Sequence, residues 1–414
     1  MPSVCFYFQV HQPYRIKNYG FFDIGLDHQL FDEAKNRQIL DKVSHKCYLP
    51  TNELMYKLIK KHNGAFRISY SISGVALEQF RDYRPDVMDS FKKLVDTGCV
   101  ELIEETYYHS LSFLYSKSEF DRQVQQHKDM VQTHFGVTPR VFRNTELIYN
   151  NEIAYHIAAL GYKGMIAEGV DRVLGNRSPN FLYHPFYKNH FPLLLKNYKL
   201  SDDIAFRFSN KGWEEHPLST EKFARWVHSI AGHGEVINLF MDYETFGEHQ
   251  WEDSGIFKFM EHLPEKILQH GDFNFKTPSE VIDSYPIRAE YDAHELTSWA
   301  DMERDLSAWR ANSMQHEALR RIYDLEQTVN DLNDASILDD WRKLQTSDHF
   351  YYMSTKFWSD GDVHKYFSPY DSPYKAYINY MNACSDLEYR IEKTQQQMPN
   401  VSALSFAINS NSEV

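Results

Sequence analysis

The sequence has few cysteines and no long apolar stretch. Its four cysteines stand far apart, at positions 5, 47, 99 and 384, and form no C-x-x-C pair. This spacing argues against a disulfide framework or a zinc ribbon and favours a reducing compartment. No window approaches the roughly 18 apolar residues of a membrane-spanning helix, and the first residues (MPSV) lack the basic and apolar segments of a secretory signal. We therefore expect a cytoplasmic protein with no membrane partner.

The chain also lacks an excess of positive charge. Lys and Arg number 44 against 58 Asp and Glu, so the formal net charge is -14. Because nucleic-acid phosphates need a basic face, we expect no nucleic-acid partner. Hydrophobic residues make up 42% and charged residues 25% of the chain, which is typical of a globular protein and excludes disorder for the whole. No heptad run or long apolar patch indicates an interface, so the sequence leaves the oligomeric state open.

Short apolar runs alternate with helical patterns through the first 290 residues or so. This alternation predicts right-handed βαβ units and a parallel sheet. About seven such units are enough for a β/α barrel. An open doubly wound sheet is the alternative, although no G-x-G-x-x-G follows a predicted strand. The predicted strands occupy residues 4–10, 66–72, 100–104, 140–143, 164–167, 204–208 and 236–241.

Helical patterns dominate the last part of the chain. Within the barrel region, residues 219–230 predict an amphipathic helix with Ser219 as its N-cap. Residues 297–332 predict one or two long helices, and residues 374–397 predict another. We therefore divide the chain into a catalytic barrel (1–289), a C-terminal helical region packed on it (290–398) and a loosely held tail (399–414).

Polar and acidic side chains follow four of the predicted strands. HQP follows the first strand, EETYYH the third, NTE the fourth and DYE the seventh. In a parallel barrel the C-terminal strand ends converge on one face, and that face holds the active site. We therefore expect Glu146 and Asp242, although far apart in sequence, to lie around one cleft.

Two facing carboxyl groups are what glycoside cleavage needs. One must be ionised, to attack or stabilise the anomeric carbon, and the other must hold a proton for the leaving oxygen. The structural explanation of each acid is a loop salt bridge or a helix cap. A metal site is a further interpretation, because three histidines near the same strand ends could ligate zinc with these acids: His11, His109 and His249. The lack of an H-E-x-x-H or similar local ligand pair argues against it.

Five short motifs occur in order along most of the chain. They are HQP at 11–13, GCVELI at 98–103 leading into YYH at 107–109, TELIY at 145–149, MDYETFGEH at 241–249 and QTSDH at 345–349. The ordered set resembles glycoside hydrolase family 57, the α-amylase and 4-α-glucanotransferase group, and the fourth motif is most similar to the α-amylase branch. The third motif departs from the family's common form, because RNTEL at 143–147 stands where a Pro-Glu or Ala-Glu before Arg is usual.

The resemblance implies a (β/α)7 barrel followed by a helical region that completes the cleft, with no metal or other cofactor. It implies retaining cleavage of α-1,4-glucosidic bonds in an α-glucan or maltooligosaccharide, with Glu146 as nucleophile and Asp242 as general acid/base. A retaining site needs these carboxyl groups about 5–5.5 Å apart. The substrate-binding residues expected around them are His11, Gln12, His109, Glu244, His249, Trp251, Asp348 and His349.

Other activities stay open on the same scaffold. Hydrolysis differs from glucanotransfer or branching only in whether water or a sugar hydroxyl reaches the covalent intermediate, and the sequence does not decide between them. A catalytically silent glucan-binding protein is an alternative of another class. A metal-dependent deacetylase or an α-mannosidase-like enzyme is a third.

Overall fold

The computed structural model describes residues 1–356 and 368–397, so the predicted tail at 399–414 lies outside the described residues. The chain forms two compact units: unit 1 comprises Met1–Tyr14 and Glu33–Trp309, and unit 2 comprises Arg15–Asp32 and the described residues from Arg310 onward. Residues 290–309, assigned above to the helical region, lie in unit 1. Compactness alone does not define a folding domain, so the domain limits at residues 289 and 398 stay a prediction.

Unit 1 contains two five-stranded sheets. In the first, the order is β3-β2-β1-β8, with β9 paired to β1, and in the second it is β10-β6-β7-β5-β4. The pairings are parallel except that of β6 with β7. The strands are β1 Ser3–Val10, β2 Ile68–Ile72, β3 Val100–Leu102, β4 Val141–Arg143, β5 Gly164–Glu168, β6 Leu182–His184, β7 Leu193–Lys196, β8 Val236–Asp242, β9 Asn274–Phe275 and β10 Ile287–Glu290.

The two sheets meet at two junctions. Just after β3, Glu104 forms a parallel bridge with Phe142 of β4. Just after β7, the Asn197 amide donates to the Asn238 carbonyl of β8 at 2.9 Å. The order β1-β2-β3-β4-β5-β7-β8 therefore runs around seven strands, with isolated links in place of full ladders at the two junctions. This arrangement confirms the predicted α/β fold with parallel strands.

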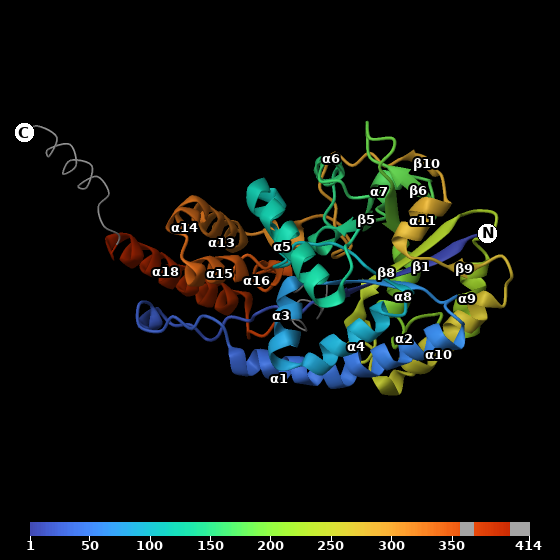
Figure 1. Ribbon diagram of the computed structural model, residues 1–414, viewed down its shortest axis with the longest axis horizontal. Coiled ribbons are helices and arrows are strands. Elements are labelled where there is room, and N and C mark those ends of the chain that lie inside the picture. Colours follow the sequence, from blue (N-terminus) through green and yellow to red (C-terminus); the bar gives the residue numbers. More distant parts are fainter. Residues whose placement is uncertain (357–367, 398–414) are drawn as a thin grey trace, which may run out of the picture. The chain divides into compact units, whose positions relative to one another are not determined.

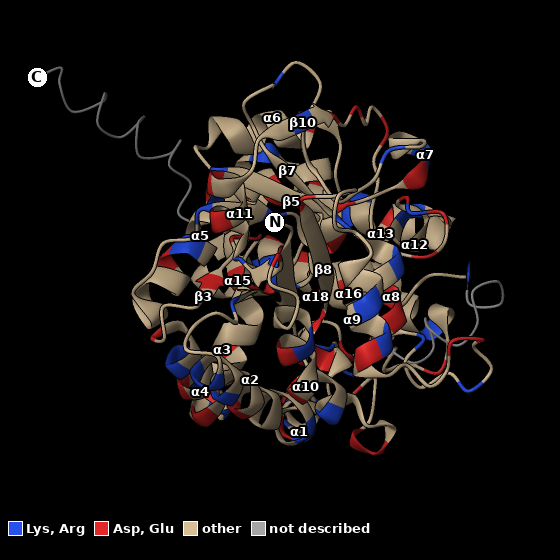
Figure 2. Cartoon of the chain, turned by 90° about the vertical axis from the view of Figure 1, so that its right-hand side faces the viewer, with Lys and Arg blue, Asp and Glu red and all other residues tan. Residues whose placement is uncertain are grey.

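Helices cover the outside of these strands. Figure 1 shows α2, α4 and α10 lying along one side of the first sheet. In Figure 2 the Lys, Arg, Asp and Glu positions are frequent along helices such as α4 and α9, whereas β5 and β7 are almost entirely tan. The helices are α1 Glu33–Val43, α2 Leu49–Lys61, α3 Gly74–Tyr83, α4 Pro85–Val95, α5 Lys117–Phe135, α6 Asn151–Ala159, α7 Asp171–Leu174, α8 Tyr198–Ala205, α9 Thr220–His228, α10 Ile256–Leu268, α11 Pro278–Ser284 and α12 Ser307–Arg310.

Strand β1 is buried on both faces because it separates two apolar cores. Phe6 and Phe8 belong to a large core shared with the outer helices. Cys5 and Tyr7, which alternate with them, belong to a smaller core that draws residues from both sheets. The period-two alternation of a strand explains this division. Helix α9 behaves as predicted, since the Ser219 side chain accepts the Lys222 amide and caps its first turn.

Two sequence predictions are wrong. Residues 204–208 form no strand: Tyr198–Ala205 is helix α8, and the strand of this region is the earlier Leu193–Lys196. The apolar residues at 204, 206 and 208 imitate the period of a strand, but Phe206 is 58% exposed. The one or two long helices predicted over 297–332 are also wrong at their start, since residues 297–306 are not helical and α12 begins at Ser307.

Unit 2 is helical. The Trp341 indole donates to the Ile322 carbonyl at 2.7 Å, and the buried Asp386 lies 3.0 Å from His28 of the 15–32 segment. Within the described ranges of either unit, no helix combines the length and the hydropathy needed to cross a bilayer. The helices are α13 Ser313–Asp324, α14 Glu326–Leu332, α15 Ala335–Lys343, α16 Ser347–Tyr351 and α18 Pro373–Gln397.

Candidate active site

A strained turn carries Glu146. Strand β4 ends at Arg143 and is followed by the 3₁₀ turn η4 (Thr145–Leu147), in which Glu146 has φ 57° and Leu147 has φ 51°. Left-handed backbone in a residue other than glycine costs about 1–3 kcal/mol and persists only where the surroundings enforce it. Here Leu147 is fully buried, while the Glu146 side chain keeps 17% exposure. The turn thus leaves a carboxylate accessible at the end of a buried strand.

Hydrogen-bond donors hold the Glu146 carboxylate from two directions. Its Oε2 accepts the Trp299 indole N–H at 2.7 Å, and its Oε1 lies 3.4 Å from Nε2 of His109. The Arg143 guanidinium and the Lys196 ammonium lie 5.1 and 5.4 Å from the centroid of the Trp299 ring. Donors and cations around a carboxylate favour its ionised form. The arrangement therefore suits a Glu146 that carries negative charge.

The other ring nitrogen of His109 contacts a fully buried acid, Glu105. Nδ1 of His109 lies 2.8 Å from Oε2 of Glu105. Burial alone would raise the pKa of Glu105, but the bond to His109 and the charge of Arg143 hold it well below its usual range. Burial alone would lower the pKa of His109, but the bonds to Glu105 and Glu146 raise it to about 9. His109 is therefore an imidazolium at neutral pH.

Asp242 occupies a different environment. It is the last residue of β8 and pairs in register with Gln9 of β1. Burial, and then the negative charge of Glu146, raise its pKa to about 6, against the lowering effects of Arg143, Lys196 and His109. The two predicted acids thus act on one another's charge, so the structure brings them to the same end of the barrel. Asp242 holds its proton to a much higher pH than an ordinary aspartate.

His11 and Glu244 lie close to His109 and Asp242, respectively. The His11 ring stacks on His109 with centroids 4.1 Å apart, and the His11 amide hydrogen bonds to the Glu244 carboxylate. Glu244 lies in the 3₁₀ turn η5 (Tyr243–Thr245), where burial and the Asp242 charge raise its pKa to about 8. Two predicted binding residues therefore lie beside the two acids.

Gln12 and His249 support Glu244 from behind. Tyr48 donates its hydroxyl to the Glu244 carboxylate, and Gln12 Nε2 donates to that hydroxyl at 3.2 Å. The His249 amide donates to the Glu244 carbonyl at 2.9 Å. Burial lowers the pKa of His249 to about 4, so its ring is neutral at pH 7.

The remaining predicted residues have other surroundings. Trp251 is 59% exposed, with the Lys46 ammonium 5.5 Å from its ring centroid. Asp348 and His349 belong to unit 2, where Tyr352 donates to Asp348 at 3.4 Å and His349 is buried. Their predicted contact with substrate stays a prediction.

Sequence reasoning missed several residues of the site. Glu105 was noticed only as part of a polar run, and Trp299 was assigned to a helix. A buried pair also went unnoticed: Glu168 ends β5 and Lys196 ends β7, with their charged atoms 3.6 Å apart. Glu168 directly follows the correctly predicted strand at 164–167. The expectation that site residues lie at C-terminal strand ends would therefore have identified it. In the described part of the chain, no three or more His, Cys, Asp or Glu side chains are grouped to hold a metal ion.

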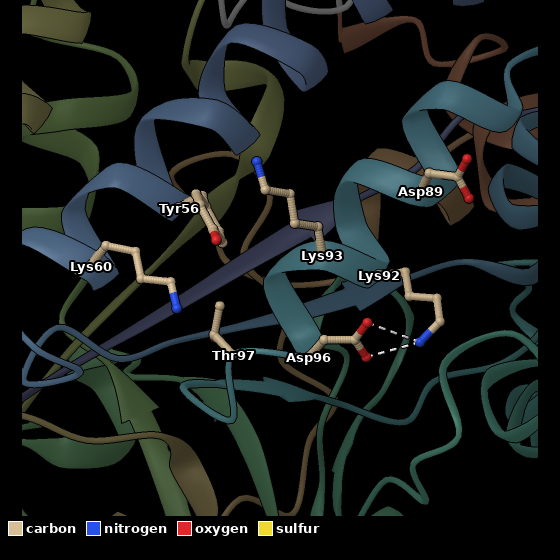
Figure 3. Close-up of a pocket in the computed structure, with 7 residues that line it drawn as sticks. All are labelled: Tyr56, Lys60, Asp89, Lys92, Lys93, Asp96 and Thr97. Carbon is tan, nitrogen blue, oxygen red and sulfur yellow. Dashed lines mark hydrogen bonds and ion pairs between the residues drawn. The ribbon is translucent and has the colours of Figure 1, made fainter.

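A separate surface pocket of about 340 Å³ lies between α2 and α4 (Figure 3). Lys60 and Lys93 place their ammonium groups 5.4 and 3.8 Å from the Tyr56 ring centroid. Lys92 pairs with Asp96 at 2.8 Å. These are exposed side chains that neutralise one another or lie on the ring, and none of the predicted site residues lines this pocket. It is not the candidate site.

Comparison with known proteins places the chain in a family. The model of glycosyl hydrolase family 57 matches residues 5–294, most of the chain, including both predicted acids, Glu146 and Asp242. The chain belongs to this family. Membership confirms the relationship predicted from the five motifs, and it makes the chain an enzyme of a glycoside hydrolase family.

Individual family members show how similar the chain is. A putative α-amylase of Methanocaldococcus jannaschii is 44% identical over 402 residues, covering 94% of this chain and 85% of that protein. An α-amylase of Pyrococcus abyssi is 19% identical over 312 residues, covering 72% of this chain but only 43% of that protein.

Solved structures share the fold at low identity. A family 57 branching enzyme from Pyrococcus horikoshii superposes with a TM-score of 0.68 at 16% identity, covering 88% of this chain and 87% of that one. A 4-α-glucanotransferase from Thermococcus litoralis gives a TM-score of 0.63 at 16% identity, covering 84% of this chain and 56% of that one. At identities this low, the similarity shows a shared fold but not a shared substrate.

Proposed function

We propose that this enzyme cleaves α-1,4-glucosidic bonds of α-glucans with retention at the anomeric carbon. The observation that carries the proposal is the contrast between two neighbouring acids. Glu146 receives the Trp299 N–H and faces cationic His109, whereas burial and the Glu146 charge raise the pKa of Asp242 to about 6. An acid with a raised pKa beside a carboxylate that receives hydrogen-bond donors is typical of an acid and nucleophile pair. The substrate class is taken from relatives named α-amylase and 4-α-glucanotransferase.

The reaction follows from the two protonation states. The Glu146 carboxylate attacks the anomeric carbon while Asp242 gives its proton to the departing glycosidic oxygen, so a glycosyl ester of Glu146 forms and the first sugar leaves as an alcohol. Asp242, now ionised, takes a proton from an incoming hydroxyl as that oxygen attacks the same carbon. Glu146 is released as a carboxylate. Two inversions give net retention.

The incoming hydroxyl decides between hydrolysis and transfer. Incubation with maltooligosaccharides of defined length tests the proposal, with products separated by chromatography and their anomeric form read by NMR. We expect shorter oligosaccharides released as the α anomer. A ladder both shorter and longer than the substrate would assign glucanotransfer at the same site, and linkage analysis would detect α-1,6 branches.

Two outcomes would overturn the proposal. Calorimetric binding of oligosaccharides without any product would identify a silent glucan-binding protein. Activity that is lost with a chelator, together with a metal at full occupancy in the purified protein, would support the metal-dependent alternative.

A further inference from the structure

A line of buried contacts runs from the barrel wall to Glu146. The Gln9 side-chain amide donates to Oε1 of Glu105 at 3.0 Å, and the Ser71 hydroxyl donates to the same oxygen. The other oxygen of Glu105 binds Nδ1 of His109. Nε2 of His109 then faces Oε1 of Glu146. Strands β1 and β2 supply the first donors, so the line begins on rigid elements.

We propose that Glu105 is a positioning residue that acts through His109 to keep the Glu146 carboxylate ionised and aimed at the anomeric carbon. The inference rests on the proposed function of Glu146. Glu105 is fully buried, which leaves it no contact with substrate of its own. Its effect on the reaction must therefore pass through the imidazole.

The neighbouring Glu104–His127 pair shows a buried glutamate–histidine contact that serves only the fold. Glu104, one residue earlier, binds Nδ1 of His127, and both side chains are fully buried. The second nitrogen of His127 contacts the Ile72 backbone carbonyl at 2.9 Å. His109 instead directs its second nitrogen at a carboxylate that solvent reaches. Its backbone also has φ 50°, a conformation that local structure must enforce.

The chemistry requires the charge of His109 to survive the intermediate. When Glu146 becomes a glycosyl ester it loses its negative charge, so Glu105 is the carboxylate that remains hydrogen-bonded to the imidazolium, while the newly ionised Asp242 acts on it only through its charge. In the second step the carboxylate reappears as the leaving group, and a cation already in place stabilises it as it forms. A fixed Glu105 therefore supports both steps.

The groups around His109 come from several elements. Glu105 follows β3, Glu146 and Arg143 belong to β4 and its turn, and His11 follows β1 and stacks on the ring. Asp242 at the end of β8 responds to the His109 charge. Of these, Glu105 is the fully buried carboxylate that is hydrogen-bonded to His109, so replacing it alters the imidazole without removing a solvent-exposed group.

The test substitutes Glu105→Gln and compares it with Glu104→Gln. The amide introduced by Glu105→Gln keeps an oxygen for Gln9 and Ser71 but turns an N–H toward His109, whose Nδ1 must then be an acceptor and therefore neutral. In NMR titration of isotope-labelled histidines, with the His109 signal assigned by its loss in His109→Asn, we expect the His109 titration to move about 1–3 pH units lower. Glu104→Gln should leave it in place. This readout needs no substrate.

Kinetics supply the second readout. We expect Glu105→Gln to lower kcat on a maltooligosaccharide about 100-fold, with a smaller change in KM, and to move the acid limb of kcat/KM to higher pH. Glu104→Gln should lower the melting temperature but keep the wild-type pH profile. An unmoved His109 titration, or kinetic losses equal in the two variants, would overturn the inference. A wild type without glucan activity would instead refute the proposed function and leave the NMR result to be judged alone.

Discussion

The Trp299 indole offers a sharp test of how Glu146 is held. Trp299→Phe removes the N–H that donates to Oε2 at 2.7 Å but keeps an aromatic ring for the Arg143 and Lys196 cations that lie 5.1 and 5.4 Å from its centroid. A hydrogen bond to a charged group contributes about 1.5–3 kcal/mol. Since about 1.4 kcal/mol is a factor of ten in rate, kcat should fall about 10- to 150-fold.

The assay is initial-rate kinetics on a maltooligosaccharide, with the melting temperature measured in parallel. Trp341→Phe is the matched control, because that indole also donates at 2.7 Å, but to the Ile322 backbone carbonyl in unit 2. The control should melt earlier and keep its kcat. A Trp299→Phe enzyme with wild-type kcat, or a control that loses as much activity, would refute the view that this indole holds the nucleophile.

Three further predictions follow from the same geometry. Because burial and the Glu146 charge raise the pKa of Asp242 to about 6, and the protonated form is the acid, kcat/KM should fall tenfold per pH unit above that value; a flat profile to pH 8 would contradict this. Glu146→Gln should lose several orders of magnitude in rate while its circular dichroism stays unchanged, and near-normal activity would exclude Glu146 as nucleophile. Lys196→Met should reduce the free energy of unfolding by about 3 kcal/mol in a urea titration, because Lys196 pairs with Glu168 and Asp202 at 3.6 and 3.1 Å; an unchanged midpoint would contradict this.

Much of the barrel could be predicted because its strands are mostly apolar and several end in polar residues. Six of the seven predicted strands overlap real ones, and the rule that parallel strand ends converge led to Glu146, Asp242 and His109. The prediction at residues 204–208 failed for a physical reason. Residues Leu193–Leu195 have no alternation and favour helices as much as strands, whereas the helix and turn that follow happened to alternate. Missing β7 also concealed Lys196 at its end.

The rest of the site depends on contacts that no periodic pattern in the sequence indicates. Trp299 reaches Glu146 across 153 positions of sequence, from a segment without regular secondary structure. Glu105 belongs to the run EETYYH. The sequence of this run does not show that Glu105 binds His109 while Glu104 binds His127. Only the fold determines which way each side chain points.

The left-handed backbone at His109, Glu146 and Leu147 has a consequence for engineering this enzyme. At Leu147 and His109 burial opposes substitution, but at the partly exposed Glu146 glycine or asparagine would release conformational energy. A library screened for heat resistance alone would therefore enrich replacements of Glu146, and the proposed nucleophile would be lost with them. Selection for thermal tolerance should accordingly be coupled to turnover from the first round.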